Sequence, residues 1–410
     1  MESVVRELLA QRLGGTQFGR DAREYKFAKL KRLREEARRA HPELELIDLG
    51  IGEPDSPADP SVVEELARQA GRPENRFYAD NGIPEFRDAA VQYMADVYGV
   101  TGLDPDLHVC PSIGSKSALA LMPLAFIDPG DAAVTTVPGY PVLATYTQYL
   151  GGEVYPLALT PENGFLPDLD SLTEEQRRRA KLLYLNYPNN PTGAVASREF
   201  FEHVVEFARR HRIMVVHDAA YAALTFDGER PLSFLSVPGA LEVGVEIHSM
   251  SKAFNMTGWR MAWVCGNELA VKAFSQVKDN TDSGQFRAIQ WACIRALRHP
   301  EITRRAAEKY ARRHRMLAEV LREAGFDARP PKASFYLYVR APRAAGSVEF
   351  ATAEDFSQWL LTEKLIATVP WDEAGHFVRL SVTFEAQDED DERRIIREVG
   401  RRLSGAKFVF

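Results

Sequence analysis

Short apolar runs alternate with amphipathic stretches between residue 46 and about residue 266 of the chain. Each run is rich in β-branched or other apolar residues and is bounded by turn residues, a pattern typical of strands buried on both faces of a sheet. The strands predicted in this way cover Leu46–Leu49, Val109–Pro111, Ala132–Val137, Leu182–Asn186, Ile213–His217 and Val243–His248.

The stretches between these runs have the spacing of helices. Apolar residues recur on one helical face from Ile83 to Val97 and again from Phe200 to Ala208. Alternating strands and helices predict an α/β fold with a mostly parallel central sheet and helices on both faces. Ligands of such sheets bind beyond the carboxyl ends of the strands, so we expect the chemistry just after each apolar run.

The pattern changes after about residue 295, where a smaller α+β domain is predicted. Its expected elements are a long charged helix over Pro300–Ala324, a strand at Phe335–Val339, a helix at Glu354–Glu363, and strands near Ile366–Val369 and Phe377–Val382. A chain of 410 residues is long for one core. We therefore expect a large domain over residues 46–295 and a small domain over 296–410, against which residues 1–45 pack.

Composition narrows the class of protein. The chain is 45% hydrophobic and 27% charged with a net charge of −7, which gives no reason to expect a nucleic-acid partner. Cys110, Cys265 and Cys293 lie in apolar stretches without the spacing of metal ligands, so neither a disulfide framework nor a metal site is expected. Early charges and the lack of a run of about 18 apolar residues argue against a signal peptide and a membrane span. We expect a cytoplasmic enzyme.

Lys252 follows the predicted strand Val243–His248, and Arg260 comes eight residues later. A lysine at the end of a buried strand loses solvation, which lowers its pKa and suits it to covalent chemistry with a carbonyl group. Ser249 and Arg260 could hold a phosphate, because guanidinium groups bind phosphate oxygens in pairs. Taken alone, a lysine after a strand is more often simply exposed to solvent.

Two other strand ends carry polar residues. Asp218 and Tyr221 follow Ile213–His217, where a carboxylate could keep a pyridine nitrogen protonated. An aspartate that caps a helix is the more common alternative. Asn190 lies in the turn Asn186–Gly193, whose prolines fix a rigid, non-helical loop, and such a loop more often just closes a strand.

Three weaker signals complete the set. The sequence Gly114-Ser115-Lys116 opens a helix, whose amino end could bind a phosphate or could be plainly capped. Tyr140 follows another strand and could stack on a flat ring or pack in the core. Arg379 lies on an apolar strand and needs a partner, either a substrate carboxylate or a structural acid.

In their order along the chain, these motifs resemble the fold type I pyridoxal-phosphate (PLP) enzymes of the aspartate aminotransferase superfamily, the class I and II aminotransferases. The resemblance runs from about Leu46 to the C-terminus. It implies Lys252 as the lysine that holds PLP covalently and moves the substrate proton, and Asp218 as the partner of the pyridine nitrogen. The further roles that it implies are phenolate contacts from Tyr221 and Asn190, phosphate contacts from Gly114, Ser115, Lys116, Ser249 and Arg260, stacking by Tyr140, and substrate contacts from Arg379, Gly52 and Asn190.

The stretches Asn255–Arg260 and Asp282–Phe286 resemble the LL-diaminopimelate aminotransferase subfamily. This resemblance implies amino-group transfer between LL-diaminopimelate and an oxo acid such as 2-oxoglutarate, in lysine biosynthesis. Tyr25 and Asp80 are placed by it on the substrate side.

Two positions depart from that subfamily. Phe77 stands where the family has a tyrosine that reaches the partner subunit's phosphate, and Tyr78 follows it. Trp371 lies in the loop before Arg379, which usually runs longer. Sites of this family are built across a dimer interface, so the resemblance implies a homodimer in which Tyr78 and Ser283 come from the partner subunit.

Three alternatives stay open. The chain could be an aminotransferase for another amino acid, such as aspartate, alanine or a secondary-metabolite precursor. It could be a PLP-dependent β-lyase or synthase, because the same cofactor serves those reactions. A non-catalytic sensory domain of this fold is disfavoured by Lys252 and by the lack of a helix-turn-helix pattern in the first 45 or so residues.

Overall fold

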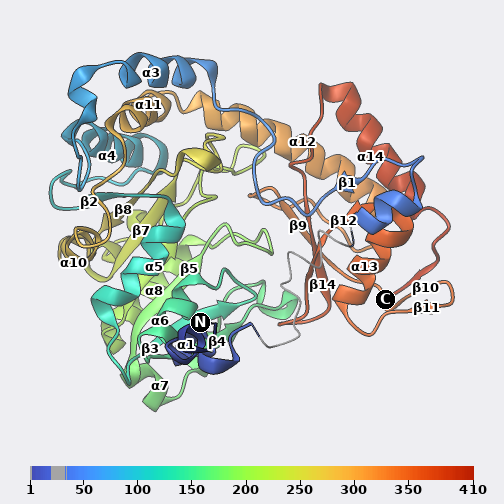
Figure 1. Ribbon diagram of the computed structural model, residues 1–410, viewed down its shortest axis with the longest axis horizontal. Coiled ribbons are helices and arrows are strands. Elements are labelled where there is room, and N and C mark those ends of the chain that lie inside the picture. The colour runs from blue at the N-terminus through green and yellow to red at the C-terminus, as the bar shows by residue number, and fades with distance from the viewer. Residues whose placement is uncertain (1, 20–32, 34) are drawn as a thin grey trace.

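A seven-stranded sheet forms the centre of the larger lobe, at the left of Figure 1. The computed structural model describes residues 2–19, 33 and 35–410. In spatial order the strands are β2 (Val109–Ser112), β8 (Ala262–Gly266), β7 (Gly244–Ser249), β6 (Met214–Asp218), β5 (Ala180–Asn186), β3 (Ala132–Val137) and β4 (Glu153–Ala158). β8 runs antiparallel to both of its neighbours, β2 and β7, and the other pairs of neighbouring strands are parallel. The predicted α/β fold with a mostly parallel sheet is confirmed.

The predicted strands mostly lie where the apolar runs place them. β3 has the predicted bounds, and β2, β5, β6 and β7 differ from theirs by one or two residues. The run Leu46–Leu49 forms β1 (Ile47–Asp48), but β1 pairs in parallel with β12 (Ile366–Ala367) and is not part of the central sheet. The prediction was wrong about its place, because an apolar run identifies a strand but not its neighbour.

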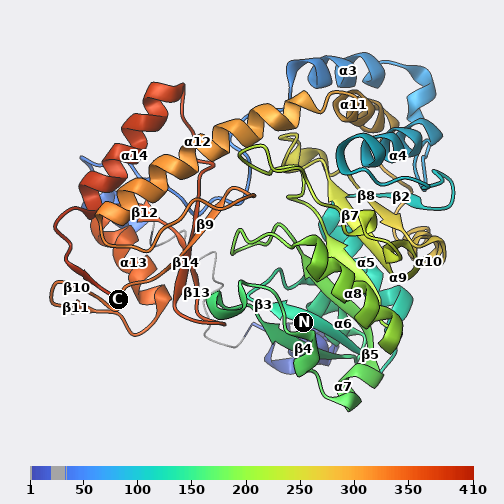
Figure 2. The same cartoon turned by 180° about the vertical axis from the view of Figure 1, so that it is seen from behind.

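Helices cover both faces of the sheet, as predicted. One face packs against α5 (Ser115–Phe126), α6 (Val142–Tyr149) and α10 (Glu268–Lys278), and Figure 1 shows α5 and α6 in front of the strands. The other face packs against α8 (Arg198–His211), which lies in front in Figure 2. The remaining helices of this lobe are α3 (Pro60–Ala70), α4 (Pro84–Tyr98), α7 (Glu174–Arg179), α9 (Ala240–Val243) and α11 (Arg287–Leu297).

Helix α8 illustrates how the sequence sets these elements. Its N-cap Ser197 accepts a hydrogen bond from Phe200 N, which satisfies one of the free amides of the first turn. Acidic Glu199 lies in that turn, and Arg209 and Arg210 lie in the last turn, where each charge favours the helix dipole. The apolar positions between them face the sheet and bury Phe201 and other side chains at helical spacing.

The described part of the smaller lobe contains three short sheets, with helices packed against them. Its helices are α12 (Glu301–Glu323), α13 (Ala353–Lys364) and α14 (Glu389–Leu403). Its strands are β9 (Tyr336–Arg340), β10 (Ala344–Ala345), β11 (Val348–Glu349), β12 (Ile366–Ala367), β13 (Val369–Trp371), β14 (Phe377–Ser381) and β15 (Phe408–Val409). The sheet that bears on the site has the order β13-β14-β9 and is antiparallel.

The N-terminal residues divide between the two lobes. Ala37, Leu44 and Leu46 pack with Leu361 and Leu365 of the smaller lobe. Helix α1 (Glu2–Glu7) and the N-terminus lie on the side of the large sheet in Figure 1, whereas the C-terminus lies with the smaller sheets. The domain boundaries predicted at residues 45 and 295 stay a prediction.

Helix α12 crosses between the lobes beside the chain that leaves β1. Asp55 is bonded by Lys309 Nζ at 2.8 Å and by Arg313 Nη1 at 3.0 Å, and Arg305 Nη2 reaches Asp59 Oδ2 at 2.6 Å. These ion pairs fix the segment 50–59 against α12. Among the described residues there is no helix long and apolar enough to cross a membrane.

Candidate active site

Three predicted site residues converge at the carboxyl ends of neighbouring strands. Asp218 ends β6, Ser249 ends β7, and Asn190 follows β5 by four residues. The side chain of Asn186, at the end of β5, donates to Asp218 O at 2.8 Å and accepts from Asn190 N at 2.8 Å. The strand ends are therefore held together at the edge where parallel sheets bind ligands.

Lys252 lies three residues beyond β7 and points toward the segment that joins the two lobes. Its Nζ atom donates to Gly52 O at 2.6 Å and lies 5.8 Å from the centre of the Phe335 ring. Burial lowers the pKa of Lys252 to about 8, and the cations of Arg260 and Arg379 act in the same direction against the anion of Glu53. A lysine of this kind is partly neutral near physiological pH, as a nucleophilic amine must be.

Asp218 is buried but has few hydrogen-bond donors. Oδ1 accepts from Ala220 N at 3.2 Å, and Oδ2 accepts from Tyr184 OH at 3.4 Å. Both bonds are long, and burial raises the pKa of Asp218 to about 6. A cation placed beside this carboxylate would lower its pKa and be stabilised in turn.

Tyr221 lies one turn beyond Asp218 and meets the smaller lobe. Its hydroxyl group lies 3.1 Å from the hydroxyl of Tyr336 on β9. Burial raises the pKa of Tyr221, and the neighbouring Tyr336 adds to this effect. Tyr221 therefore stays protonated and can donate to an anionic oxygen.

Arg379, on β14, is buried between the lobes. Its Nη1 donates to Asn190 Oδ1 at 2.9 Å and its Nη2 donates to Gly50 O at 3.2 Å. The guanidinium carbon lies 4.1 Å from the centre of the Tyr336 ring, and Nε has no hydrogen-bond partner. No carboxylate of the described residues forms an ion pair with Arg379, so a substrate carboxylate can take that place.

Gly52 comes within reach of the same arginine. A Cβ atom at this position would lie 3.2 Å from Tyr336 Oη and 4.0 Å from Arg379 Nη2. Its carbonyl oxygen already accepts from Lys252. Glycine thus leaves the space between the lysine and the arginine open.

A cradle for an anion lies at the amino end of α5. Gly114 has φ +78° and lies so close to the Arg260 guanidinium that any side chain there would collide with it. The hydroxyl of Ser115 is buried without a hydrogen-bond partner. Helix amides, a guanidinium and a free hydroxyl together suit a phosphate group.

Arg260 is held toward this cradle by its own loop. Its Nη1 donates to Thr257 O at 2.8 Å and more weakly to Ser251 Oγ at 3.4 Å. The hydroxyl of Ser249 accepts from Ser251 N at 3.0 Å, which fixes the turn before Lys252. Lys116 is exposed on α5, and no contact of its side chain is seen in the described structure.

Tyr140 and the residues expected from a partner show no polar contact with Lys252 in the described structure. Tyr140 is half-buried and packs with the apolar cluster that contains Tyr184. Tyr78, Asp80 and Ser283 are exposed, and Ala79 N donates to Ser283 O at 3.3 Å, so their two loops are neighbours. Tyr25 lies outside the described residues.

Sequence reasoning missed two tyrosines of the site. Tyr184 reaches Asp218 from β5, and Tyr336 reaches Tyr221 and Arg379 from β9. Tyr184 and Asp218 share one face of the sheet because Asn186 pairs with Asp218 in the register, so strand alternation was a signal for it. No local pattern marks Tyr336, because its contacts join distant parts of the chain.

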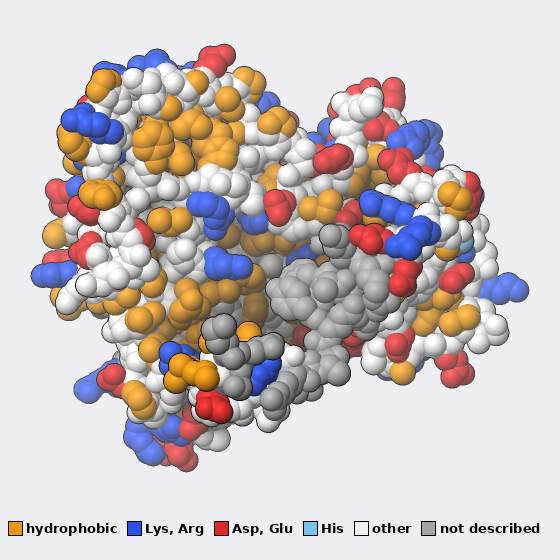
Figure 3. Space-filling view, in the orientation of Figure 1, with side chains coloured by type: hydrophobic (Ala, Val, Ile, Leu, Met, Phe, Trp, Pro, Cys, Tyr) orange, Lys and Arg blue, Asp and Glu red, His pale blue; other side chains and the backbone are white. Residues whose placement is uncertain are grey.

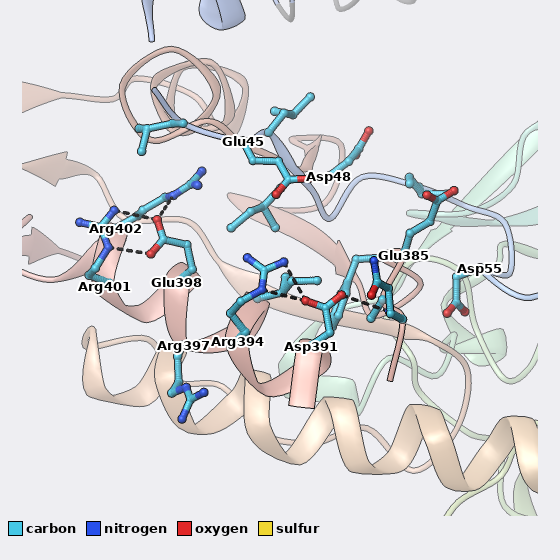
Figure 4. A pocket seen from close by; sticks show the side chains of 18 of the residues that line it. Glu45, Asp48, Asp55, Glu385, Asp391, Arg394, Arg397, Glu398, Arg401 and Arg402 are labelled. Atoms are coloured by element: carbon cyan, nitrogen blue, oxygen red, sulfur yellow. Dashed lines mark hydrogen bonds and ion pairs between the residues drawn. The ribbon is translucent and has the colours of Figure 1, made fainter. Parts of the chain in front are cut away.

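A second concave region lies between residues 43–55 and α14 (Figure 4). Its volume is about 1160 Å³. Several of its charged side chains pair with one another, including Arg394 with Asp391 and both Arg401 and Arg402 with Glu398. None of its described lining residues was predicted to contact cofactor or substrate, and no described group of His, Cys, Asp and Glu suits a metal ion.

Comparison with known proteins agrees with this geometry. Residues 45–395 match the family of class I and II aminotransferases, and the chain belongs to that family. It is 56% identical to the LL-diaminopimelate aminotransferase of Methanocaldococcus jannaschii over 418 aligned positions, which cover 100% of both proteins. The enzyme of the same name from Methanococcus maripaludis is 53% identical, also over 100% of both.

Solved structures support the same fold. The substrate-bound BacF structure from Bacillus subtilis has a TM-score of 0.83 and 31% identity, with 100% of this chain and 98% of that one covered. An aspartate aminotransferase double mutant from Thermus thermophilus has a TM-score of 0.81 and 29% identity, with 96% and 99% covered. The predictions of a fold type I aminotransferase and of PLP as its cofactor are confirmed. The chain is an enzyme that transfers amino groups.

Proposed function

We propose that this enzyme transfers an amino group from LL-diaminopimelate to an oxo acid such as 2-oxoglutarate, as a step of lysine biosynthesis. The observation that carries the amino-acid part is Arg379, a buried guanidinium with a free Nε and no acidic partner among the described residues. A carboxylate bound there would lie beside Gly52 and hence near Lys252 Nζ. The donor itself is proposed from the relatives of that name at 56% and 53% identity.

The residues of the site fit PLP. The anion cradle with its unpartnered Ser115 hydroxyl fits the phosphate group, and the poorly solvated Asp218 fits the pyridine nitrogen. Within this proposal PLP is held by Gly114, Ser115, Lys116, Tyr140, Asn190, Asp218, Tyr221, Ser249, Lys252 and Arg260. Lys116 and Tyr140 are the least supported of these, because neither shows a polar contact at the cradle.

In the mechanism, bound PLP supplies an electron sink that stabilises negative charge at the substrate Cα. Arg379 and Asn190 bind the substrate carboxylate and set the orientation of Cα. With PLP bound, Lys252 Nζ would take the proton from Cα as a general base and then, as a general acid, would deliver it to C4′ of the cofactor. A pKa of about 8 leaves roughly one-tenth of this amine neutral at pH 7. The Gly52 carbonyl holds the free amine near the site at 2.6 Å.

We also propose a homodimer with shared sites, in which Tyr78, Ser283 and Asp80 face the partner subunit. Phe77, Tyr78 and Phe286 are 53%, 78% and 44% exposed, although they are large apolar or aromatic side chains. Figure 3 shows hydrophobic side chains gathered near α11 and α5 on the face in view. The Tyr78 loop is nevertheless held firmly, because the Arg287 guanidinium donates twice to Tyr78 O.

The dimer is tested by hybrid enzymes. Subunits with Lys252→Ala and subunits with Tyr78→Phe should each show low activity alone. Mixed dimers should recover activity, because one of their two sites carries neither substitution. Light scattering that gives a monomer, or a mixture that recovers nothing, contradicts shared sites.

A cytoplasmic location is part of the same proposal. Cys110, Cys265 and Cys293 are free and buried, and burial raises the pKa of each thiol. Free thiols of this kind are common in reducing compartments. Cell fractionation with a tagged chain that finds it outside the cytoplasm contradicts this part.

Transamination is distinguished from elimination by a half-reaction. The donor alone should convert bound PLP into its amino form and release one equivalent of oxo acid. Ammonia and pyruvate formed without an acceptor would identify a lyase instead. Lys252→Ala is the control, and it should hold no PLP covalently and lose turnover by about 10²- to 10⁴-fold.

The donor is settled by a panel of amino acids with 2-oxoglutarate as the acceptor. LL-Diaminopimelate should give the highest kcat/KM, ahead of aspartate, alanine and aromatic amino acids. Activity with another donor and none with LL-diaminopimelate would show that the enzyme is an aminotransferase but that LL-diaminopimelate is not its donor.

A further inference from the structure

A buried carboxylate on β7 takes no part in the mechanism above. Glu246 is fully buried and accepts four hydrogen bonds. Its donors are His217 Nδ1 at 2.8 Å, His248 Nε2 at 3.1 Å, Ser233 Oγ at 2.5 Å and Phe234 N at 2.6 Å. Burial alone would raise the pKa of Glu246, but the bonds from the two histidines outweigh it and hold the pKa below its ordinary value. Glu246 is therefore an anion.

His217 connects this anion to the backbone of the next strand. Its Nε2 lies 3.2 Å from Tyr187 N, which can only donate, so Nε2 carries no proton and accepts this bond. The proton of the neutral ring is then on Nδ1, where it is donated to Glu246. One ring on β6 thus joins Glu246 of β7 to the residue that directly follows β5.

Tyr187 begins the loop that contains Asn190. The side-chain oxygen of Asn190 accepts from Arg379 Nη1 at 2.9 Å, and the loop closes through Asn189 N bonded to Ala194 O at 2.8 Å. A continuous path therefore runs from Glu246 through His217 to the first amide of this loop. Its far end meets the arginine that is proposed to bind the substrate.

We infer that Glu246 and His217 are positioning residues, which fix the 187–193 loop and thereby place Asn190 for cofactor and substrate. This inference rests on the proposed function, in which Asn190 and Arg379 face the reacting groups. Neither positioning residue touches the site, because His217 is fully buried and its ring packs on Phe201 and Phe234, away from Asp218. The anion strengthens the bond by polarising the ring toward Tyr187.

His248 provides a matched control. It is as buried as His217 and bonds the same carboxylate through Nε2 at 3.1 Å. Its ring stacks on Trp263, with the centroids 5.1 Å apart and the planes 12° apart. It has no contact with the 187–193 loop in the described structure. Replacing His248 should disturb the carboxylate while leaving the bond to Tyr187 in place.

The test compares His217→Phe with His248→Phe. Hydrogen exchange of the segment 187–193 is measured in the cofactor-free protein, and KM, kcat and Tm are measured in the holoenzyme. We expect His217→Phe to speed exchange roughly tenfold and to raise KM for the amino acid roughly 10- to 100-fold. His248→Phe should lower Tm to a similar extent but leave exchange and KM within about twofold of the unaltered protein.

A second variant keeps the inference testable if the phenylalanine variant does not fold. His217→Gln retains an oxygen that can accept from Tyr187 N and should restore slow exchange and a low KM. Equal exchange in His217→Phe and His248→Phe, or in His217→Gln and His217→Ala, overturns the inference. The exchange readout needs no substrate, so an inference that fails is distinguished from a wrong donor or a wrong reaction, which the kinetics of the unaltered enzyme reveal.

Discussion

Two buried carboxylates on neighbouring strands differ in their pKa values. Asp218 ends β6 and Glu246 lies within β7, and both are at most 5% exposed. Burial raises the pKa of Asp218 to about 6, whereas the pKa of Glu246 is lowered because hydrogen bonds outweigh its burial. The difference is in their donors, since Asp218 has two long bonds and Glu246 has four shorter ones.

The two carboxylates differ in the way expected of a structural anion, Glu246, and of the proposed cofactor partner, Asp218. Glu246 is satisfied by the protein itself, so its charge contributes to the folded state. Asp218 is left short of donors, so its charge is stabilised only when a cation arrives. Two other buried atoms of the proposed site, Ser115 Oγ and Arg379 Nε, have no hydrogen-bond partner.

The largest effect is expected at Asp218, the carboxylate with few hydrogen-bond donors. Asp218→Asn removes the anion beside the proposed pyridine nitrogen and should lower kcat/KM by about 10²- to 10³-fold. Steady-state kinetics with saturating PLP measure it. Asp218→Glu is the control that keeps the charge. A loss of less than about tenfold in Asp218→Asn would show that the difference between the two carboxylates has no catalytic meaning.

Glu246→Gln should instead lower the stability of the folded protein. It removes a buried charge that His217 and His248 both contact, and we expect the free energy of unfolding to fall by about 2–4 kcal/mol at pH 8. Urea unfolding of the holoenzyme measures this loss. Stability equal to that of the unaltered enzyme would mean that the four donors do not favour the charged form.

The pH dependence of stability separates the two groups by sign. A pKa raised from 3.8 to about 6 means that Asp218 contributes stability below pH 3.8, which is lost as the pH rises through 6. Between pH 5 and pH 8, cofactor-free Asp218→Asn should therefore be more stable than the unaltered protein, by about 1–3 kcal/mol in the free energy of unfolding. For Glu246 the lowered pKa means stability present above pH 4.5 and lost as the pH falls further. Thermal unfolding at several pH values checks both directions, and a constant difference for Asp218→Asn contradicts the first.

The smallest effect is expected for an exposed pair. Arg401 bonds Glu398 at 2.6 Å, but the arginine side chain is 65% exposed. Arg401→Ala should leave the urea midpoint close to that of the unaltered enzyme, because water screens the pair. Urea unfolding under the same conditions as for Glu246→Gln allows the stabilities of the two variants to be compared directly. If Arg401→Ala destabilised the protein as much as Glu246→Gln, burial would not explain the size of these effects.

Apolar runs located most of the fold, and the exceptions have physical reasons. Ala132–Val137 is β3 at its predicted bounds because both faces of this strand are buried. β4 (Glu153–Ala158) was missed because Pro156 interrupts its apolar run, and a proline argues against a strand unless the strand lies at the edge of a sheet, as β4 does. β8 (Ala262–Gly266) was missed although it is fully buried, because it follows the Arg260 turn directly with no stretch of turn residues to delimit it.

The sequence predicted those site residues that follow the ends of strands, because the ends of parallel strands lie at one edge of the sheet. Lys252, Asp218 and Arg260 follow from that rule. Arg379 Nη1 donates to Asn190 Oδ1, and the substrate contacts that the resemblance implies for both residues stay predictions. Tyr336 could not be found, because its contact with Tyr221 joins residues 115 positions apart. The roles of Tyr78, Asp80 and Ser283 depend on a second chain and stay predictions.

The separation of β14 from the seven-stranded sheet has a consequence for engineering. The cradle and Asp218 belong to the large sheet, whereas Arg379 and its neighbour Tyr336 belong to the three-stranded sheet. The proposed contacts of the phosphate and the pyridine nitrogen thus lie on the large sheet, whereas the proposed carboxylate contact of Arg379 lies on a separate sheet. Exchange of residues 334–383 between related aminotransferases would therefore move the proposed carboxylate-binding sheet as one unit and leave the proposed phosphate cradle and Asp218 unchanged.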